Sequence, residues 1–111
     1  DETYKLKQRN NIYFAGQISG VEGYVESAAS GLIVAISIIE NMKGKNIEFP
    51  DNTMLGSLAK YVSTENKNFQ PMNANFGILK PLDEKIKDKK ERYKMMANRA
   101  LEEITNLKNT L

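Results

Sequence analysis

The sequence predicts a mainly α-helical chain that forms part of a larger α/β fold. Residues 23–42 are apolar or small with helical spacing, and a second amphipathic stripe repeats every three and four residues near the C-terminus. One short apolar strand, residues 12–15, has no clear partner strand in the chain. The expected order is therefore a short β-strand, a glycine loop, a long buried helix, a short helix and a C-terminal amphipathic helix.

The first element is a short apolar strand that runs into a glycine loop. Ile12–Ala15 is apolar and aromatic, as a buried strand would be, and Gly16, Gly20 and Gly23 follow it. Their spacing does not match the G-x-G-x-x-G dinucleotide fingerprint, and a tight turn with close packing is an ordinary explanation for them. The nearest candidate partner strand, residues 46–49, is short and ends at a proline. The unpaired backbone groups therefore indicate a larger sheet.

A long helix is expected from Glu22 or Gly23 to about Met42. Its apolar and small positions cover most of the circumference, so we expect burial on more than one side. Gly31 in its interior costs about 1 kcal/mol relative to alanine, which close approach of another backbone would offset. Gly44, between two lysines, is placed to end the helix. The apolar and small positions are Val25, Ala28, Ala29, Leu32, Ile33, Ala35, Ile36, Ile39 and Met42.

The middle of the chain combines a short helix with an irregular segment. Thr53 suits the N-cap of a helix that reaches about Ser63. Residues 64–81 contain two prolines and have no helical or strand period. Long segments of this kind within a domain are usually functional or disordered, and apolar residues such as Phe69 and Phe76 argue against disorder.

The last element is a long amphipathic helix. We expect it to run from Pro81 or Leu82 to about Asn109, with Asp83 and Glu84 in the first turn, where the helix dipole favours acidic residues. Its apolar stripe consists of Tyr93, Ala97, Ala100, Ile104, Leu107 and Leu111.

Composition excludes several kinds of chemistry. The chain has 111 residues, the size of one small domain, and its 41% hydrophobic and 27% charged residues are ordinary for a soluble globular protein. It has no cysteine, which excludes disulfides and thiolate chemistry, and no histidine, so no metal site is expected. We see no secretory signal and no membrane span, because the apolar run 32–39 is too short. A cytoplasmic location is expected.

Three ordered motifs resemble a known family. Residues 16–32 read GQISGVEGYVESAASGL, residues 67–77 read KNFQPMNANFG, and residues 88–93 read DKKERY. In this order and spacing they resemble the folate- and FAD-dependent tRNA (uracil-5-)-methyltransferase family, also called TrmFO or Gid. The strand and its Gly-Gln step also resemble the strand beside the FAD ribityl chain in two-dinucleotide-domain flavoproteins, with Gln17 in place of an aspartate.

A related flavoprotein, the tRNA uridine carboxymethylaminomethyl-modification subunit, shares the Gly-Gln and Gly-Tyr steps. After the tyrosine it typically has Glu-Glu-Ala-Ala, where this chain has Val-Glu-Ser-Ala at residues 25–28. The resemblance therefore favours the methyltransferase.

The resemblance implies a reaction and its cofactors. Methylenetetrahydrofolate would donate a one-carbon unit, reduced FAD would carry and reduce it with NAD(P)H as reductant, and C5 of a T-loop uridine in tRNA would receive it. Backbone N–H groups at the start of helix 23–42 would meet the negative N1–C2=O edge of reduced flavin. The implied FAD contacts are Gly16, Gln17, Gly20, Val21, Glu22, Gly23 and Tyr24.

Four residues are candidates to contact folate or the base. Tyr24 could stack near the flavin or the pterin, although a packed aromatic at a helix start is an equal alternative. The amides of Gln70, Asn73 and Asn75 suit a pterin or base edge, although asparagine also forms turns. Glu22 and Glu26 could act on substrate protons, but the helix dipole favours carboxylates there in any case.

The basic residues near the C-terminus are candidates for tRNA phosphates. The chain has a formal charge of only +2, but residues 80–111 hold nine Lys and Arg against six Asp and Glu. A solvated helix face is the ordinary alternative for such a run. The candidates are Lys85, Lys89, Lys90, Arg92 and Lys94.

The resemblance also implies that other parts of the site lie outside this chain. The cysteine chemistry of the family and its N-terminal FAD-diphosphate motif are both missing, so no catalytic residue is expected here and the chain reads as a C-terminal fragment, inactive alone. We expect residues 1–45 to be the last strand–loop–helix unit of the FAD-binding domain, 46–82 a loop-rich connection and 83–111 a basic amphipathic helix.

Helix 23–42 should pack on the remainder of the FAD-binding domain. Without it, the helix should pack on another copy, in a crystal or a homo-oligomer. An independent helical module that binds tRNA or protein is the alternative, which the unpaired strand and incomplete glycine site disfavour.

Overall fold

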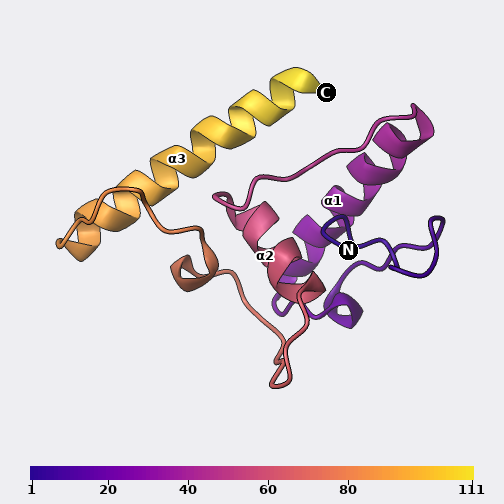
Figure 1. Ribbon diagram of the computed structural model, residues 1–111, viewed down its shortest axis with the longest axis horizontal. Helices are drawn as coiled ribbons and strands as arrows, with labels where there is room; N and C mark the ends of the chain where they lie inside the picture. Colours follow the sequence, from indigo (N-terminus) through magenta and orange to yellow (C-terminus); the bar gives the residue numbers. More distant parts are fainter.

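The structure, a computed structural model that describes residues 1–111, is mainly helical, as the sequence predicts (Figure 1). It contains three α-helices and two short 3₁₀ turns and no β-strand. In chain order the elements are η1 (Gln17–Ser19), α1 (Tyr24–Met42), α2 (Met54–Ser63), η2 (Phe76–Ile78) and α3 (Lys89–Thr110). Helices α1 and α2 pack together, η2 packs on α2, and α3 runs along one edge of the molecule (Figure 1).

Local sequence signals set the ends of α1 and α2 as predicted. The Thr53 hydroxyl accepts a hydrogen bond from the Gly56 N–H at 3.1 Å and donates one to the Pro50 carbonyl at 2.7 Å, which caps α2. Gly44 follows the last residues of α1 with a φ of 78°, the left-handed conformation typical of a helix stop. Both predictions are confirmed.

The predicted start of the last helix is wrong. Helix α3 begins at Lys89, and the side chain of Asp88 caps it by accepting a hydrogen bond from the Lys90 N–H at 3.2 Å. Residues 81–88 stay irregular, so Asp83 and Glu84 lie outside the first turn. The Arg99 guanidinium donates hydrogen bonds to backbone carbonyls at the start of this segment, which holds it along the side of α3 instead of in line with it.

The expected strand at Ile12–Ala15 is also wrong. Tyr13 forms an isolated antiparallel bridge with Lys5, flanked by backbone hydrogen bonds of 2.8 and 3.0 Å. The partner lies in the polar N-terminal residues, which have no alternating apolar pattern and therefore gave no strand signal. Residues 46–49 form no strand either. The chain thus pairs this segment locally, at a single bridge.

A small apolar core joins segments that are far apart in the sequence. It draws on the N-terminal segment, the glycine loop, α1, the connection before α2, and α2 itself, with Leu107 of α3 packed against it. Ile33 and Ala59 are fully buried at its centre. The core residues are Tyr4, Val21, Ile33, Phe49, Leu58 and Ala59. This core positions the glycine loop against the two central helices.

Helix α1 turns its apolar stripe outward. Its buried positions include the polar Ser30, Ser37 and Glu40, whereas Val25 is 79% exposed and Met42 is 83% exposed. The outward stripe repeats every three and four residues, at Val25, Ala28, Leu32, Ala35, Ile39 and Met42. The expected burial on more than one side is therefore not found within this chain, because only one side of α1 has a partner.

The interior glycine of α1 also faces open space. A Cβ atom placed on Gly31 would meet nothing within 4 Å, so no backbone approaches it within this chain. Helix α1 is also long and apolar enough to cross a membrane, with a mean hydropathy of 1.3. Core helices of soluble proteins pass the same test, so the absence of a membrane span stays a prediction.

The outward stripe of α1 predicts self-association of the isolated chain. An exposed apolar surface of this length favours contact with another apolar surface, so we expect a concentration-dependent increase in mass in sedimentation velocity. Leu32→Glu should return the chain to a monomer. Leu101→Glu is the matched control, since Leu101 is also an exposed leucine, on α3. If both changes have the same effect, association does not use the α1 stripe.

Candidate functional site

Hydrogen bonds join the glycine loop to the start of α1. We call residues 16–24 the glycine cradle. At its first residue, the Gly16 N–H donates a hydrogen bond of 2.7 Å to the hydroxyl of Ser30, which is fully buried on α1. The Ser30 hydroxyl in turn donates to the Ser27 carbonyl at 2.7 Å. Because Ser30 lies in the second turn of α1, these bonds fix the loop to the helix that it leads into.

Residues 72–74 close the cradle from the other side. The Glu22 N–H donates to the Met72 carbonyl at 2.9 Å, and the Met72 N–H donates to the Gly20 carbonyl at 3.0 Å. The Asn73 amide donates to the Glu22 carbonyl at 2.8 Å. The Ala74 N–H donates to the carboxylate of Glu26 at 3.1 Å. The first two sequence motifs, some 50 residues apart, therefore meet at one place.

The N-terminus of α1 is open. Its N-cap is Gly23, which has no side chain to accept a hydrogen bond, and the N–H groups of Tyr24, Val25 and Glu26 have no protein acceptor. The other two helices are capped by Thr53 and Asp88, as described above. Unpaired N–H groups at the positive end of a 19-residue helix favour an anionic or carbonyl group of a ligand.

The cradle has room for a flat ligand edge. Tyr24 is 95% exposed, so its ring is not packed within this chain. A Cβ atom on Gly16 would meet nothing within 4 Å, whereas one on Gly23 would collide with the Glu26 carboxylate. Gln17, in η1, is also exposed. The unpaired N–H donors at the helix start thus fit the N1–C2=O edge of a flavin.

Not every candidate group is free. The Glu22 N–H is bonded to Met72, which differs from the expectation that it would face the flavin. Asn75 caps η2, since its side-chain oxygen accepts a hydrogen bond from the Gly77 N–H at 2.9 Å. The Asn73 amide nitrogen binds the cradle, which leaves its oxygen without a protein partner. Gln70 is exposed, and only its backbone carbonyl is used, by the hydroxyl of a neighbouring tyrosine at 3.1 Å.

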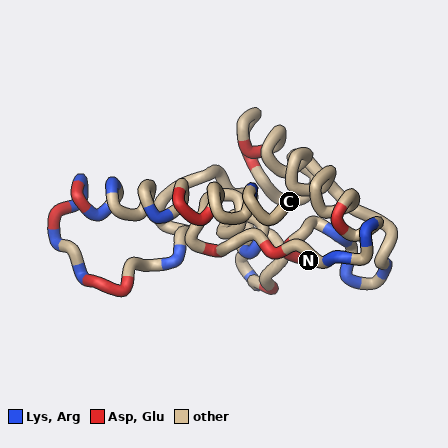
Figure 2. Tube along the Cα trace, turned by 90° about the horizontal axis from the view of Figure 1, so that it is seen from above, with Lys and Arg blue, Asp and Glu red and all other residues tan.

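The basic candidates do not form one face. Lys85 lies in the irregular segment before α3, and the other four lie in the first turns of α3. Lys89 and Arg92 lie 5.5 and 5.4 Å from the ring of Tyr93, which stacks on Phe76 at 4.2 Å. Figure 2 shows that blue and red residues alternate around this end of the molecule. Lys85, Lys90 and Lys94 form no ion pair with any carboxylate.

Sequence reasoning missed how the site is held together. The bonds from Ser30 to the loop and from Glu26 to the 72–74 segment have no local sequence signal, because each joins residues that meet only after folding. No group of three or more His, Cys, Asp or Glu side chains is placed to hold a metal ion.

Comparison with known proteins supports the resemblance. Residues 1–46 match the family model described as "Glucose inhibited division protein A". The chain is 57% identical over 113 residues to "Methylenetetrahydrofolate--tRNA-(uracil-5-)-methyltransferase TrmFO" of Staphylococcus carnosus (strain TM300), a match that covers 99% of this chain and 26% of the relative. The protein of the same name from Halalkalibacterium halodurans is 59% identical over 106 residues, which covers 94% of this chain and 24% of the relative.

A third relative with this name, from Staphylococcus aureus (strain JH9), is 57% identical over 114 residues and matches 100% of this chain and 26% of its own length. The chain therefore spans about a quarter of the length of the curated relatives that it matches. Over nearly all of its residues, the resemblance of this chain to the TrmFO family is confirmed.

Proposed function

We propose that this chain supplies the flavin-facing part of an enzyme that methylates C5 of a uridine in the tRNA T-loop. The methyl donor would be methylenetetrahydrofolate, the bound cofactor FAD, and the reductant NAD(P)H. The name of these relatives supports the donor, the tRNA and the uracil-5 position. A cytoplasmic location belongs to the same proposal, since tRNA is the substrate. The observation that carries the proposal is the open N-terminus of α1 inside the glycine cradle.

The cradle would act on the flavin through fixed dipoles. The N–H groups of Tyr24 and Val25 would donate to the N1–C2=O edge, where reduced flavin is negative, and the dipole of α1 adds to this stabilisation. FAD, when bound, supplies the redox chemistry of the reaction. Tyr24 would lie against the exposed side of the flavin or pterin, because its ring has no partner in this chain. The oxygen of Asn73 is the nearest free acceptor for a pterin or base amine.

The basic start of α3 would contact the tRNA backbone. Lys85, Lys90 and Lys94 are exposed and unpaired, so their ammonium groups are free to meet phosphates. Lys89 and Arg92 lie against the ring of Tyr93, which would hold their cationic groups in place for such contacts. The chain has no cysteine, so a nucleophilic thiol would have to come from elsewhere in the protein.

The test compares two purified proteins. The first is a full-length TrmFO protein that carries this segment, and the second is the 111-residue chain alone. We expect flavin absorbance and 5-methyluridine formation in the first, dependent on methylenetetrahydrofolate and NAD(P)H. The chain alone should neither hold flavin tightly nor methylate tRNA, because it contains only one edge of the site. Stoichiometric flavin on the isolated chain would contradict this part of the proposal.

Analysis of the modified nucleoside separates the rival reading. A carboxymethylaminomethyl group at a different uridine, instead of 5-methyluridine, would assign the protein to the related flavoprotein. Binding of tRNA by the isolated chain with full affinity, together with no flavin in the full-length protein, would favour the independent helical module.

A further inference from the structure

Glu26 places a carboxylate at the open end of α1. It is the third residue of the helix and is half-buried. A Cβ atom on Gly23 would collide with this carboxylate, so the side chain of Glu26 folds back over the N-cap residue. The negative charge therefore lies at the end of the helix where the N–H groups of Tyr24 and Val25 are unpaired.

This carboxylate does not cap its own helix. A glutamate at the third position of a helix can accept a hydrogen bond from the N–H of the N-cap residue, as in a capping box. No such bond forms with Gly23, and Glu26 instead accepts a bond of 3.1 Å from the Ala74 N–H, 48 residues away. A carboxylate that only complements the helix dipole needs no partner outside the helix. The side chain of Glu26 therefore serves the 72–74 segment as well as α1.

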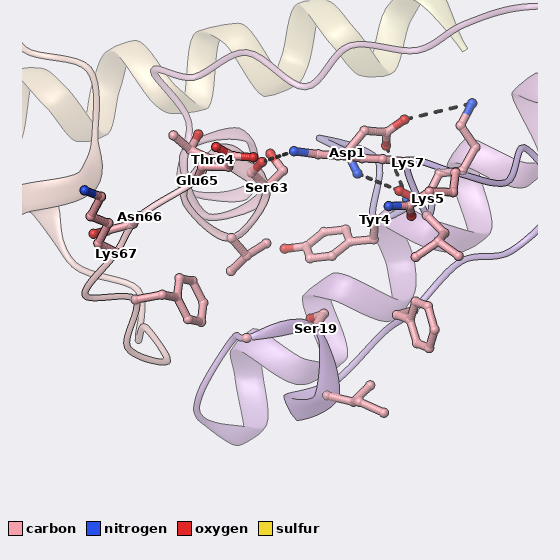
Figure 3. A pocket seen from close by; sticks show the side chains of 17 residues that line it. Asp1, Tyr4, Lys5, Lys7, Ser19, Ser63, Thr64, Glu65, Asn66 and Lys67 are labelled. Carbon is pink, nitrogen blue, oxygen red and sulfur yellow. Dashed lines mark hydrogen bonds and ion pairs between the residues drawn. The ribbon is translucent and has the colours of Figure 1, made fainter.

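Residues 73–75 depend on hydrogen bonds to stay at the cradle. Met72 packs against the core, but residues 73–75 are exposed. Earlier in the same loop, residues 64–67 line an open hollow of about 900 Å³, across which Asn66 and Lys67 lie opposite Ser19 of η1 (Figure 3). Of the bonds that join the 72–74 segment to the cradle, only the bond to Glu26 has a carboxylate acceptor. Bonds to charged acceptors are the stronger ones.

Asn73 is held between two of these bonds. Its amide nitrogen donates to the Glu22 carbonyl at 2.8 Å, and the next residue, Ala74, is bonded to Glu26. The Asn73 amide nitrogen also lies 3.2 Å from the position of a Cβ atom on Gly23. Asn73 and Glu26 thus meet over the same N-cap residue, with the unpaired side-chain oxygen of Asn73 beside the open end of α1.

We propose that Glu26 is a positioning residue of the cradle, with two linked effects on the flavin site. Through the Ala74 N–H it fixes Asn73 beside the open end of α1. Through its charge it opposes the helix dipole, which lowers the affinity of the cradle for the negative N1–C2=O edge of reduced flavin relative to oxidised flavin. The resulting lower reduction potential suits a site that must reduce a one-carbon unit to a methyl group. The inference rests on the proposed function, since it takes FAD as the ligand of the cradle.

The test uses a full-length TrmFO protein that carries this segment, with two substitutions of Glu26. Glu26→Gln keeps an oxygen that can accept from the Ala74 N–H but removes the charge, whereas Glu26→Ala removes both. Each should favour reduced over oxidised flavin by about fivefold, which raises the reduction potential by about 20 mV for a two-electron couple. Equilibration of the bound flavin with a redox dye of known potential measures the shift.

Hydrogen exchange separates the hydrogen bond from the charge. The Ala74 amide should exchange about five- to tenfold faster in Glu26→Ala, because its hydrogen bond is lost, and no more than about twofold faster in Glu26→Gln. The Met72 amide donates to the Gly20 carbonyl and does not involve Glu26, so its exchange should match the wild type in both variants. Mass spectrometry with residue-level fragmentation measures both amides, with or without bound flavin.

Glu102→Gln is the matched control for the loss of charge. Glu102 is an exposed glutamate on α3 whose carboxylate forms no ion pair. Its substitution changes the net charge by the same amount as Glu26→Gln. The reduction potential and the exchange of the Ala74 amide should both stay at their wild-type values in this control.

A higher potential in both Glu26 variants, with faster Ala74 exchange in Glu26→Ala alone, supports the inference. A wild-type or lower potential in Glu26→Gln would overturn it, as would wild-type exchange of the Ala74 amide in Glu26→Ala. Either result leaves the proposed function standing, provided that the unsubstituted protein holds flavin and forms 5-methyluridine. An unsubstituted full-length protein without flavin would instead refute the proposed function, and the inference would fall with it.

Discussion

Replacing Gly23 by alanine is expected to reduce flavin affinity in a full-length TrmFO protein by about 10- to 100-fold. Gly23 has a φ of 109°, which side-chain-bearing residues rarely adopt, and a Cβ atom there would collide with the Glu26 carboxylate. Glu26 would have to move and would release the Ala74 N–H that it holds at 3.1 Å. The cradle and the 72–74 segment would then lose one of the four hydrogen bonds that join them. Flavin absorbance of the purified variant, and titration of the apoprotein with FAD, measure the effect.

Gly44→Ala is the matched control for backbone strain. Gly44 has a φ of 78° at the opposite end of α1, and a Cβ atom there would meet nothing within 4 Å. Its substitution carries a similar conformational penalty, about 28 Å from the cradle along the helix. Flavin content should therefore be that of the wild type. If Gly23→Ala also keeps its flavin with unchanged affinity, the cradle does not bind the cofactor.

The largest loss of stability is expected for Gly56→Ala. Gly56 lies in the first turn of α2, and a Cβ atom there would overlap the carbonyl oxygen of Pro50, a backbone atom that cannot move aside. The Pro50 carbonyl also accepts the hydrogen bond of the Thr53 hydroxyl, so a shift there would disturb the cap of α2. We expect a loss of about 3 kcal/mol in the free energy of unfolding and a melting temperature lower by about 10 °C or more.

Gly31→Ala is the control for that substitution. Gly31 also lies within a helix, but a Cβ atom there is free of contacts, so the isolated chain should gain up to about 1 kcal/mol from better helix propensity. Urea unfolding followed by circular dichroism compares the two variants. In a full-length protein the same change tests whether another backbone packs against Gly31. A loss of stability in the full-length protein, with a gain in the isolated chain, would show that another backbone packs against α1 at Gly31.

Features with short-range causes were predictable from the sequence. The Thr53 cap, the stop at Gly44 and the helical period of residues 24–42 each depend on neighbours within one or two turns. The three motifs were readable for a different reason, because a family resemblance does not require the fold to be known. The mainly helical class and the family resemblance were therefore accessible before the structure.

Features that depend on distant partners were not predictable. The sequence predicts too early a start for α3, because Pro81 is a good first helical residue. In the structure, Asp88 caps the helix and Arg99 donates a hydrogen bond to the preceding segment, so the helix begins later. The supposed strand found its partner at Lys5, in residues with no strand pattern. In both places, a contact outside the local window outweighed the local preference.

The sequence by itself determined the mainly helical class of this chain, its glycine loop and its resemblance to the TrmFO family, since these follow from local spacing and from motif identity. Only the tertiary structure decided that residues 72–74 close the cradle, that α1 turns its apolar stripe outward, and that the carboxylate of Glu26 binds the Ala74 N–H. The physical reason is that hydrogen bonds and burial between residues far apart in the chain exist only when the backbone has brought them together.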